Sequence, residues 1–415
     1  MRGPWTLTRN GDVRTVGPRV LVSAVNHPDA VNPYIGLFNH RIARSLHDGG
    51  VSIDVVSPRP FAPPRGPYSE YAMLPDTEDW GDYDVHHPRF WYLLPKRLFY
   101  GISGDSFAKR TSAYVEKTFE VPNVVQACHI YLDGYGLLPY CRDHDVPLFV
   151  VAHGHFMNNY DDLSRGVRRR VDETLDACAK VLCVSDALAE AAAGRVSESK
   201  VETVPIGAAP SRYPTDRRSE IRRELGIDPG TTVALFVGEF SERKGIPELA
   251  EVLPTLSLPD TEFVFVGHGG AMRWDIQSAL AASEFTDRHV YTGVTSLALR
   301  RWLTVADLLV LPSRAEGRPT AIYEAMAAET AVLGTEIGGI SEQVVDGETG
   351  VLVPPRNPDA LADALVDLTG DRERLRPLGR RGRDRLVEQG WTWDAYADRV
   401  RTLYEDSEHA GPPGR

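Results

Sequence analysis

Short apolar runs alternate with longer amphipathic stretches along most of this 415-residue chain. This alternation is typical of β-α-β units built around parallel sheets. In the first half, it predicts a strand over residues 19–25, a turn over 32–38 and a helix over 38–48. Further strands are predicted at 53–57, 124–127, 148–152 and 181–184.

A second series of the same kind begins at Val233. It predicts strands at 233–237, 262–266, 290–292, 308–311 and 331–334. Residues 208–216, between the two series, are rich in proline and alanine and favour a linker. The pattern therefore predicts two parallel α/β domains with a cleft between them. Ligands of such sheets bind beyond the carboxyl ends of the strands.

Composition and charge narrow the function mainly by exclusion. The formal net charge of −12 argues against a nucleic-acid-binding protein, which would present a basic face. The four cysteines form no C-x-x-C motif, so we expect reduced core thiols rather than a zinc or redox site. Residues 1–16 are polar, and no apolar run approaches the ~20 residues that span a bilayer. We therefore expect a cytoplasmic protein, with contact at the inner face of the membrane left open.

Two glutamates frame the first candidate site. Glu316 follows the predicted strand at 308–311, and Glu324 lies on the helix after it. At the rise of an α-helix, their carboxylates should be on the order of 10 Å apart. That is too far for the ~5–5.5 Å pair of a retaining glycosidase. The spacing suits hydroxyls at the two ends of a nucleotide sugar; the alternative is an ordinary strand, turn and acidic helix start.

Between the glutamates, the sequence favours an anion site. Gly317 permits close approach of a ligand to the backbone, and Pro319 suits the first turn of the helix. Free amides at a helix start attract an anion such as diphosphate. Arg243 and Lys244 follow another predicted strand and could pair with the same diphosphate, although a solvated basic turn would look similar.

Several motifs together resemble one enzyme family. They are the Glu316/Glu324 spacing, Glu324-Ala-Met-Ala327, Gly338-Gly-Ile-Ser-Glu342, Gly347-Glu-Thr-Gly-Val-Leu-Val-Pro354, Arg243-Lys244-Gly245 and Val266-Gly-His-Gly269. The chain is similar here to the group-1, retaining glycosyltransferases (glycosyltransferase family four), which have the GT-B fold. The resemblance is dense over residues 233–365 and looser before them. It implies two Rossmann-like domains facing a central cleft.

The resemblance also implies that the two domains bind different substrates. Residues 1–209 would bind the acceptor and would be completed by a C-terminal helix over 392–415. Residues 210–391 would bind a nucleotide-diphosphate sugar. No cofactor or metal is implied, because the cations of the protein would neutralise the diphosphate as charge builds on it.

The resemblance implies roles for particular residues. Glu324 would hold the ribose and Glu316 the donor sugar near C3. The backbone of Gly317, Arg318, Pro319 and Thr320 would hold sugar and phosphates, and Arg243 and Lys244 would neutralise the diphosphate. Base contacts would come from backbone near Val294.

In the first half, Asn32-Pro-Tyr-Ile-Gly36 resembles the family's glycine loop near the diphosphate, with Gly36 at that position. His129-Ile-Tyr-Leu-Asp-Gly134 resembles its H-x4-D-G segment. His153 would contact the donor sugar beside the reacting carbon, with His155 as a near alternative. A strand-end histidine satisfied by backbone is the structural alternative for His153.

The chain departs from the family pattern at three positions. Glu239 replaces an arginine, Glu329 opens a segment that is often Gly-x-Pro, and Arg318 occupies a position that is usually apolar. Two Asp-x-Asp triplets, at 82–84 and 143–145, would suggest a metal-dependent transferase, but the first fits a polar loop and the second an ordinary turn.

The expected function is transfer of a hexose-type sugar to an acceptor hydroxyl with retention of configuration. The acceptor would be a glycolipid or lipid-linked glycan in cell-surface polysaccharide or glycoprotein glycan synthesis. Two alternatives stay open: a nucleotide-sugar epimerase or hydrolase, and a catalytically weakened sugar-nucleotide-binding subunit.

Residues 88–101, PRFWYLLPKRLFYG, interleave aromatic and basic side chains as membrane-surface segments do, although a loop over the core is the alternative. We predict that the purified chain floats with vesicles containing anionic lipid and not with neutral vesicles. Added salt should weaken the binding because it screens the attraction. Failure to bind anionic vesicles at working salt would rule out the membrane hypothesis.

Overall fold

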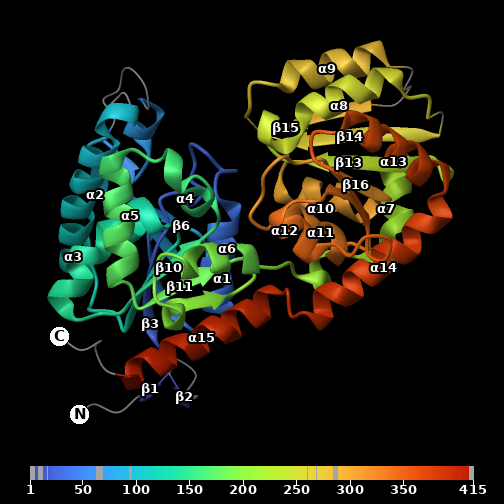
Figure 1. Cartoon of the computed structure of the whole chain (residues 1–415). Helices are drawn as coiled ribbons and strands as arrows, with labels where there is room; N and C mark the ends of the chain where they lie inside the picture. Colours follow the sequence, from blue (N-terminus) through green and yellow to red (C-terminus); the bar gives the residue numbers. More distant parts are fainter. Residues whose placement is uncertain are drawn as a thin grey trace. The chain divides into compact units, whose positions relative to one another are not determined.

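A computed structural model of the chain describes residues 5–7, 13–15, 17–61, 69–92, 96–258, 260–267, 269–283 and 288–410. The chain forms two compact units (Figure 1). Unit 1 consists of Met1–Pro205 and Trp393–Arg415, and unit 2 consists of Ile206–Thr392. The chain therefore passes between the units twice, and the expected boundary at residue 209 lies close to the first crossing.

Unit 1 is built on an eight-stranded sheet with the order β12-β11-β10-β9-β3-β4-β7-β6. The strands are β3 (Arg19–Ser23), β4 (Ser52–Val56), β6 (Thr77–Asp79), β7 (Asp84–His86), β9 (Val124–Ala127), β10 (Leu148–Ala152), β11 (Lys180–Cys183) and β12 (Val201–Thr203). All neighbours run parallel except β6, which is antiparallel to β7. Every residue of β9 and β10 is buried, which explains why the sequence shows nearly continuous apolar runs there.

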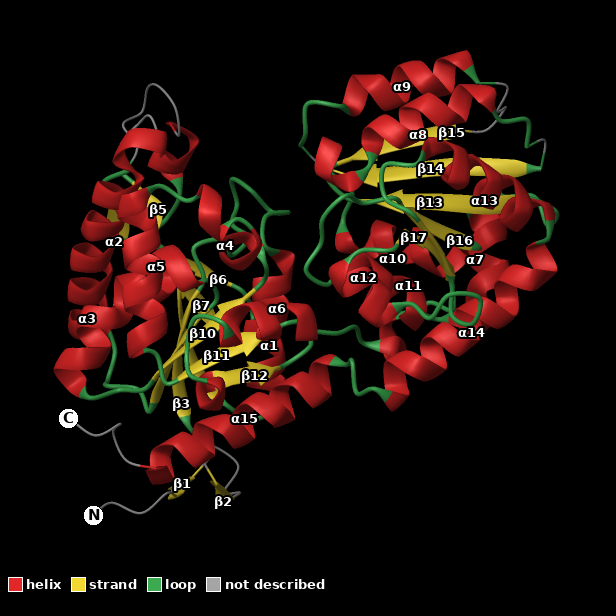
Figure 2. Ribbon diagram, in the orientation of Figure 1, coloured by secondary structure: helices red, strands yellow, loops and turns green. Residues whose placement is uncertain are grey.

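Helices cover this sheet, with α2, α3 and α5 on one side and α1 and α15 on the other (Figure 2). The helices of unit 1 are α1 (Leu37–Asp48), α2 (Lys96–Thr118), α3 (Tyr135–His144), α4 (His155–Asn158), α5 (Arg165–Ala177), α6 (Asp186–Ala193) and α15 (Trp393–Ala410). The last of these returns from the end of the chain and buries Tyr396 and Tyr404. The Tyr404 hydroxyl donates to the Gln126 side chain on β9, so α15 is fixed to the centre of the sheet.

Unit 2 contains a six-stranded, wholly parallel sheet with the order β15-β14-β13-β16-β17-β18. The strands are β13 (Thr232–Val237), β14 (Thr261–Gly267), β15 (Arg288–Thr292), β16 (Leu308–Leu311), β17 (Ala331–Thr335) and β18 (Val351–Val353). The helices are α7 (Arg218–Glu224), α8 (Ile246–Val252), α9 (Arg273–Ala282), α10 (Ser296–Val305), α11 (Thr320–Ala327), α12 (Gly338–Gln343), α13 (Pro358–Gly370) and α14 (Arg372–Glu388).

The predicted elements agree closely with these. Strands β9, β10 and β16 have the predicted bounds, and the other predicted strands overlap observed ones. The pattern missed the short strands β6, β7, β12 and β18. It also missed the two-stranded pairs β1 (Trp5–Leu7) with β2 (Val13–Thr15) and β5 (Arg59–Pro60) with β8 (Arg89–Phe90). All four cysteines are buried and free, as expected. Among the described helices, none is both long and apolar enough to cross a membrane.

A buried carboxylate joins several elements of unit 2 near the amino-terminal ends of its strands. Asp307, directly before β16, has a side chain that is 2% exposed. Its oxygens accept from Arg222 and Arg372, each at 3.1 Å, and from the backbone amide of Val233 at 3.0 Å. Asp307 therefore ties α7, α14 and β13 to the start of the central strand.

We predict that Asp307→Ala lowers the free energy of unfolding of unit 2 by about 3–5 kcal/mol, because the Arg222 guanidinium would stay buried without its partner. Asp367→Ala is the matched control: Asp367 also pairs with an arginine of α14, Arg374, but its side chain is 60% exposed. The control should cost about 0–1 kcal/mol. Urea unfolding measures both, and equal losses would contradict the structural role of Asp307.

Candidate functional site

The loop between β16 and α11, residues 312–319, lies at the carboxyl edge of the unit 2 sheet. From one side it is held by β17 and α12. The Thr335 hydroxyl donates to the Ser313 carbonyl at 2.6 Å. A Cβ built on Gly339 would lie 1.3 Å from the Gly317 carbonyl oxygen, so only glycine permits this approach.

From the other side the same loop is held by the loop after β13. Gly245 has a φ of 74°, and a Cβ built on it would lie 2.0 Å from the Pro312 carbonyl oxygen. The amide of Arg314 donates to the Arg243 carbonyl at 2.8 Å. These contacts explain the glycine after Arg243-Lys244: it lets the basic turn lie directly against the loop that carries Glu316.

The structure brings Glu316, Arg243 and Lys244 into one cluster. Glu316 Oε1 lies 2.5 Å from Lys244 Nζ and accepts from the Ser313 hydroxyl at 2.9 Å. Glu316 Oε2 accepts from Arg243 at 3.1 Å. The Glu316 and Lys244 side chains are 7% and 12% exposed, whereas Arg243 is half-exposed. Within this cluster two cations surround one carboxylate, so the cations could also pair with a second anion. Sequence reasoning missed Ser313.

Glu324 lies inside α11 and is buried. One of its oxygens accepts from the Tyr213 hydroxyl at 3.2 Å. Sequence reasoning missed Tyr213, because it lies 111 residues earlier in the chain and belongs to no recognisable motif. This bond orients the carboxylate, a group whose two oxygens can together accept about four hydrogen bonds.

Three further sequence candidates, Pro319, Thr320 and Val294, lie at the same edge of the sheet. Pro319 precedes α11 and Thr320 begins it, and none of the described side chains caps that helix start. A helix start of this kind favours binding of an anion. Val294 follows Gly293, whose φ is 68°, in the short loop between β15 and α10.

In unit 1, His153 follows the last residue of β10. Its Nε2 is buried and has no hydrogen-bond partner among the described residues, so the backbone does not satisfy that atom. The ring packs at 4.6 Å from the Phe38 ring and 5.6 Å from the His129 ring. Burial, with a smaller contribution from His129, lowers the pKa of His153 well below its ordinary value, so the imidazole is neutral.

A small cavity of about 20 Å³ adjoins His153 and is lined also by His129, His155 and Phe156. His129 Nδ1 lies 2.8 Å from Asp133 Oδ2, and the other Asp133 oxygen accepts from Ser23 Oγ and from the Val25 amide, each at 2.8 Å. The H-x4-D-G segment thus joins the carboxyl ends of β3 and β9 near His153. The exposed His155 lies on α4.

Gly36 precedes α1 and has a φ of 59°. A Cβ built on it would lie 1.5 Å from the Asn26 carbonyl oxygen, so a side chain cannot be accommodated. This contact places the 32–36 turn against the segment that follows β3. Gly36 and His153 therefore both lie at the carboxyl edge of the unit 1 sheet.

Comparisons with known proteins identify the family of the chain. The family described as "Glycosyl transferases group 1" matches residues 217–385, and "Glycosyltransferase Family 4" matches residues 35–212. The chain belongs to the group-1, family-4 glycosyltransferases.

Two relatives illustrate the likeness in sequence. TuaC of Bacillus subtilis (strain 168), a glycosyltransferase assigned provisionally to teichuronic acid biosynthesis, is 29% identical over 348 residues, which are 82% of this chain and 86% of TuaC. D-inositol 3-phosphate glycosyltransferase of Nocardia farcinica is 34% identical over 215 residues, which are 49% of this chain and 47% of that protein.

Two solved structures show the fold. Sucrose-phosphate synthase from Thermosynechococcus elongatus has a TM-score of 0.76 at 22% identity, covering 95% of this chain and 100% of that one. Anabaena Alr3699/HepE, solved with UDP-glucose, has a TM-score of 0.70 at 17% identity, covering 94% and 100%. The glycosyltransferase therefore has the GT-B fold.

The structure explains two of the departures from the family pattern. Glu329 has a φ of 54°, a conformation that favours glycine. Its side chain accepts from the Thr215 hydroxyl at 3.4 Å and lies 3.8 Å from Arg383, so tertiary contacts hold the backbone instead. Arg318 points into unit 2: its side chain is 3% exposed and contacts Glu342, Tyr323 and Trp391. Glu239 is partly exposed, and the structure gives no reason for it.

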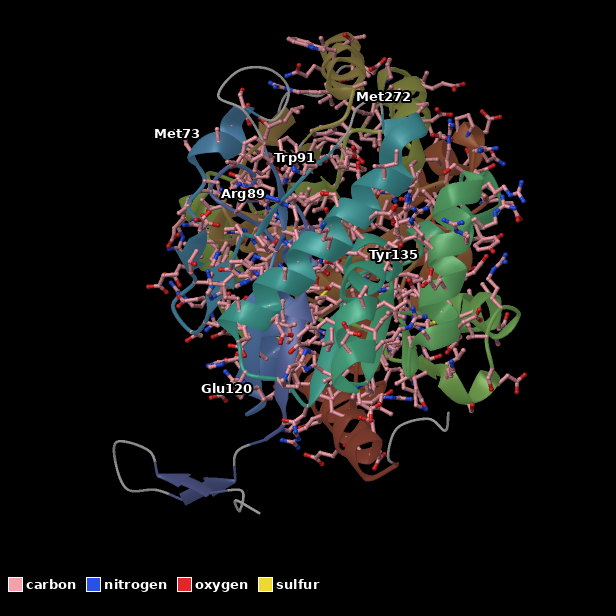
Figure 3. The ribbon with its side chains drawn as sticks, turned by 90° about the vertical axis from the view of Figure 1, so that its left-hand side faces the viewer. Met73, Arg89, Trp91, Glu120, Tyr135 and Met272 are labelled. Atoms are coloured by element: carbon pink, nitrogen blue, oxygen red, sulfur yellow. The ribbon has the colours of Figure 1, made fainter. Side chains whose placement is uncertain are left out.

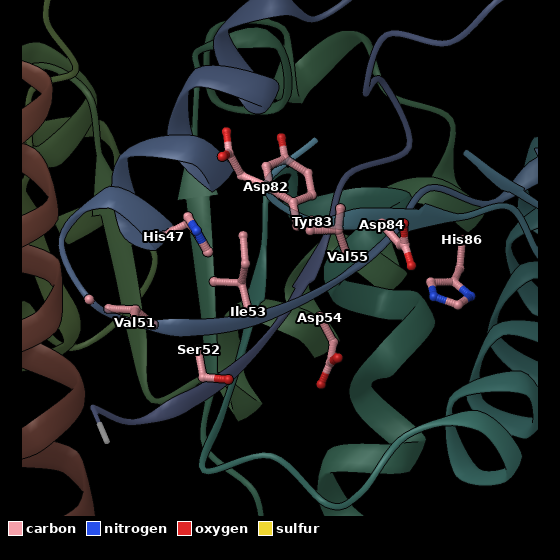
Figure 4. A pocket seen from close by; sticks show the side chains of 11 residues that line it. His47, Val51, Ser52, Ile53, Asp54, Val55, Asp82, Tyr83, Asp84 and His86 are labelled. Atoms are coloured by element: carbon pink, nitrogen blue, oxygen red, sulfur yellow. The ribbon is translucent and has the colours of Figure 1, made fainter. Parts of the chain in front are cut away.

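The first Asp-x-Asp triplet lines a pocket of about 420 Å³ (Figure 4). The pocket lies at the amino-terminal ends of β4 and β7, away from the edge where parallel sheets bind ligands. Asp82 pairs with Arg44 at 2.9 Å, and Asp54, another lining residue, pairs with Arg19 at 2.9 Å. Among the described residues, no group of three or more His, Cys, Asp or Glu side chains could hold a metal ion.

The neutral His153 gives a pH prediction for this glycosyltransferase. Below the ordinary histidine pKa of 6.5, the unfolded chain gains a proton at His153 and the folded chain does not. The free energy of unfolding should therefore decrease as the pH is lowered, by at most about 1.4 kcal/mol per pH unit for this group. His153→Asn should remove that part of the slope in urea unfolding between pH 7 and pH 5. An unchanged slope would contradict a buried neutral imidazole.

Proposed function

We propose that this glycosyltransferase moves a hexose from a nucleotide-diphosphate sugar to an acceptor hydroxyl with retention of configuration and without a metal. The cluster of Glu316, Lys244 and Arg243 carries the proposal. It supplies the cations that a diphosphate needs and, beside them, a carboxylate that can accept hydrogen bonds from a sugar. Unit 2 would bind the donor, and unit 1 would bind the acceptor.

The diphosphate would be bound by the basic turn and by the start of α11. Lys244 is mostly buried, so its attraction to an incoming phosphate is screened less than at an open surface. Arg243 is half-exposed and can turn from Glu316 to the ligand. The backbone of Gly317, Arg318 and Thr320 would add amide donors where the helix start favours negative charge.

The two glutamates would bind hydroxyls on either side of this diphosphate. Glu324, oriented by Tyr213, would accept from the ribose hydroxyls. Glu316 would accept from the hexose near C3 once the cations are shared with the ligand. Val294 would contribute backbone contacts to the base.

The reaction would be a same-face substitution. The bond between the sugar's C1 and the phosphate oxygen breaks, and its electrons stay on the phosphate, which Lys244 and Arg243 stabilise. The acceptor oxygen then bonds to C1, and its proton passes to the leaving phosphate. His153, on unit 1, would contact the donor sugar beside C1 and would carry no charge.

The acceptor would be a glycan or a lipid-linked glycan. The provisional assignment of TuaC to teichuronic acid biosynthesis supports a cell-surface polymer. Unit 1 also exposes apolar side chains (Figure 3): Met73 is 88% exposed and Trp91 is 53% exposed. The Trp91 ring contacts the exposed Phe61 ring at 4.8 Å. Membrane contact through this face stays a prediction.

A donor panel tests the function. A cognate nucleotide sugar should raise the melting temperature by mass action. Its sugar should be transferred, with release of the nucleoside diphosphate, only when an acceptor is added. Formation of a new nucleotide sugar without acceptor would favour an epimerase. Loss of the sugar to water would favour a hydrolase, and binding without turnover would favour a binding subunit.

We predict that Glu324→Ala weakens donor binding about tenfold or more, because hydrogen bonds to a charged group contribute about 1.5–3 kcal/mol each. Glu251→Ala, at an exposed position on α8, is the control and should bind the donor like the wild type. Calorimetric titration with the panel's best ligand measures both. Unchanged affinity in Glu324→Ala would show that the ribose is bound elsewhere.

A further inference from the structure

Arg318 belongs to the loop between β16 and α11, yet its side chain leaves that loop. Its Nε and one terminal nitrogen lie 2.9 and 2.7 Å from the same Glu342 oxygen on α12. Its other terminal nitrogen donates to the Tyr323 hydroxyl at 3.2 Å. The guanidinium lies 5.1 Å from the centre of the Trp391 ring.

Trp391 lies next to the second crossing between the units. Its carbonyl accepts from the Ala208 amide at 3.2 Å, and a Cβ built on Gly207 would lie 2.1 Å from its oxygen. Within unit 2, the segments that adjoin the two crossings therefore pack together at Trp391. Arg318 connects the β16–α11 loop to this point.

We propose that Arg318 is a positioning residue for the transfer reaction. It fixes the middle of the β16–α11 loop to Glu342 and Trp391, so that the loop's backbone amides face the donor diphosphate in one arrangement. The proposal rests on the proposed function, since it assigns these amides to a diphosphate.

The contacts favour positioning over direct binding of phosphate. The Arg318 guanidinium is 3% exposed, its charge is paired with Glu342, and one side of it is covered by an aromatic ring. Elsewhere the loop is held through its backbone, by Thr335, Arg243 and the close approach of Gly339. It is also held through two side chains: Arg314 donates to Glu248 on α8 at 2.7 Å, and Glu316 pairs with the basic turn. Arg318 joins the middle of the loop to α12 and to the Trp391 ring. Without it, Glu342 and the Tyr323 hydroxyl would lose a donor.

The same ring provides an internal control. Arg385, on α14, lies 5.0 Å from the centre of the Trp391 ring. It donates to the carbonyls of Glu342 and Gln343, each at 3.0 Å. Arg385 thus contacts the same aromatic ring and the same helix, α12, as Arg318 does. It belongs to α14, however, and not to the β16–α11 loop. Replacing it should affect stability without moving the loop.

The experiment compares ligands with and without a diphosphate. UDP and GDP, each beside its nucleoside, are titrated into the wild type, Arg318→Leu and Arg385→Leu. Arg318→Leu should weaken binding of the nucleoside diphosphate about tenfold or more and leave nucleoside binding nearly unchanged. Arg385→Leu should lower the melting temperature and preserve the ratio of the two affinities.

If Arg318→Leu does not fold, Arg318→Lys and Glu342→Gln test the same contacts and should shift the ratio in the same direction. The positioning role would be overturned if the ratio of diphosphate affinity to nucleoside affinity were the same in the wild type and in the Arg318 or Glu342 variant that folds. It would also be overturned if Arg385→Leu changed this ratio by the same amount. A wild type that binds none of these diphosphates contradicts the proposed function itself, and the positioning role with it. Binding with an unchanged ratio contradicts the positioning role alone.

Discussion

The β16–α11 loop is fixed by two backbone approaches that only glycine allows. Gly245 lies against the Pro312 carbonyl on one side, and Gly339 lies against the Gly317 carbonyl on the other. These approaches depend on the strand order of unit 2, in which β16 has β13 and β17 as neighbours. Because the strands are parallel, the loops that follow all three emerge at one edge. The candidate donor site is therefore a consequence of sheet order and of the absence of a side chain at two positions.

This close packing also fixes the electrostatics of the site. Lys244 and Arg243 reach Glu316 because the basic turn lies directly against its loop. The carboxylate keeps both cations in place, which avoids the cost of an unpaired buried charge. Under the proposed mechanism the cations shift toward the diphosphate, and the carboxylate becomes an acceptor for sugar hydroxyls. The arginine that the family usually has at the position of Glu239 is not needed to form this cluster.

Much of the fold could be predicted from the sequence, because β9, β10 and β16 are buried on both faces and give unbroken apolar runs. The strands β12 and β18 have only three residues each, too few to show a period. At the site, motif spacing pointed to Glu316, Glu324, Arg243 and Lys244. It could not reveal Tyr213, which reaches Glu324 across 111 residues. Nor could it show that Arg318 faces inward, because the direction of a side chain depends on neighbours distant in sequence.

The two units differ in the charge that they bring to the carboxyl edges of their sheets. Unit 2 brings two cations, which suit a leaving group that gains negative charge. Unit 1 brings His153, whose pKa is lowered by burial so that the ring is neutral. Under the proposed mechanism, the sugar ring becomes positively charged as the bond to phosphate breaks. A protonated histidine beside C1 would oppose that charge, whereas a neutral imidazole can still form a hydrogen bond with a sugar hydroxyl. Under the proposed mechanism, the lowered pKa of His153 would keep positive charge away from the carbon that must itself become positive.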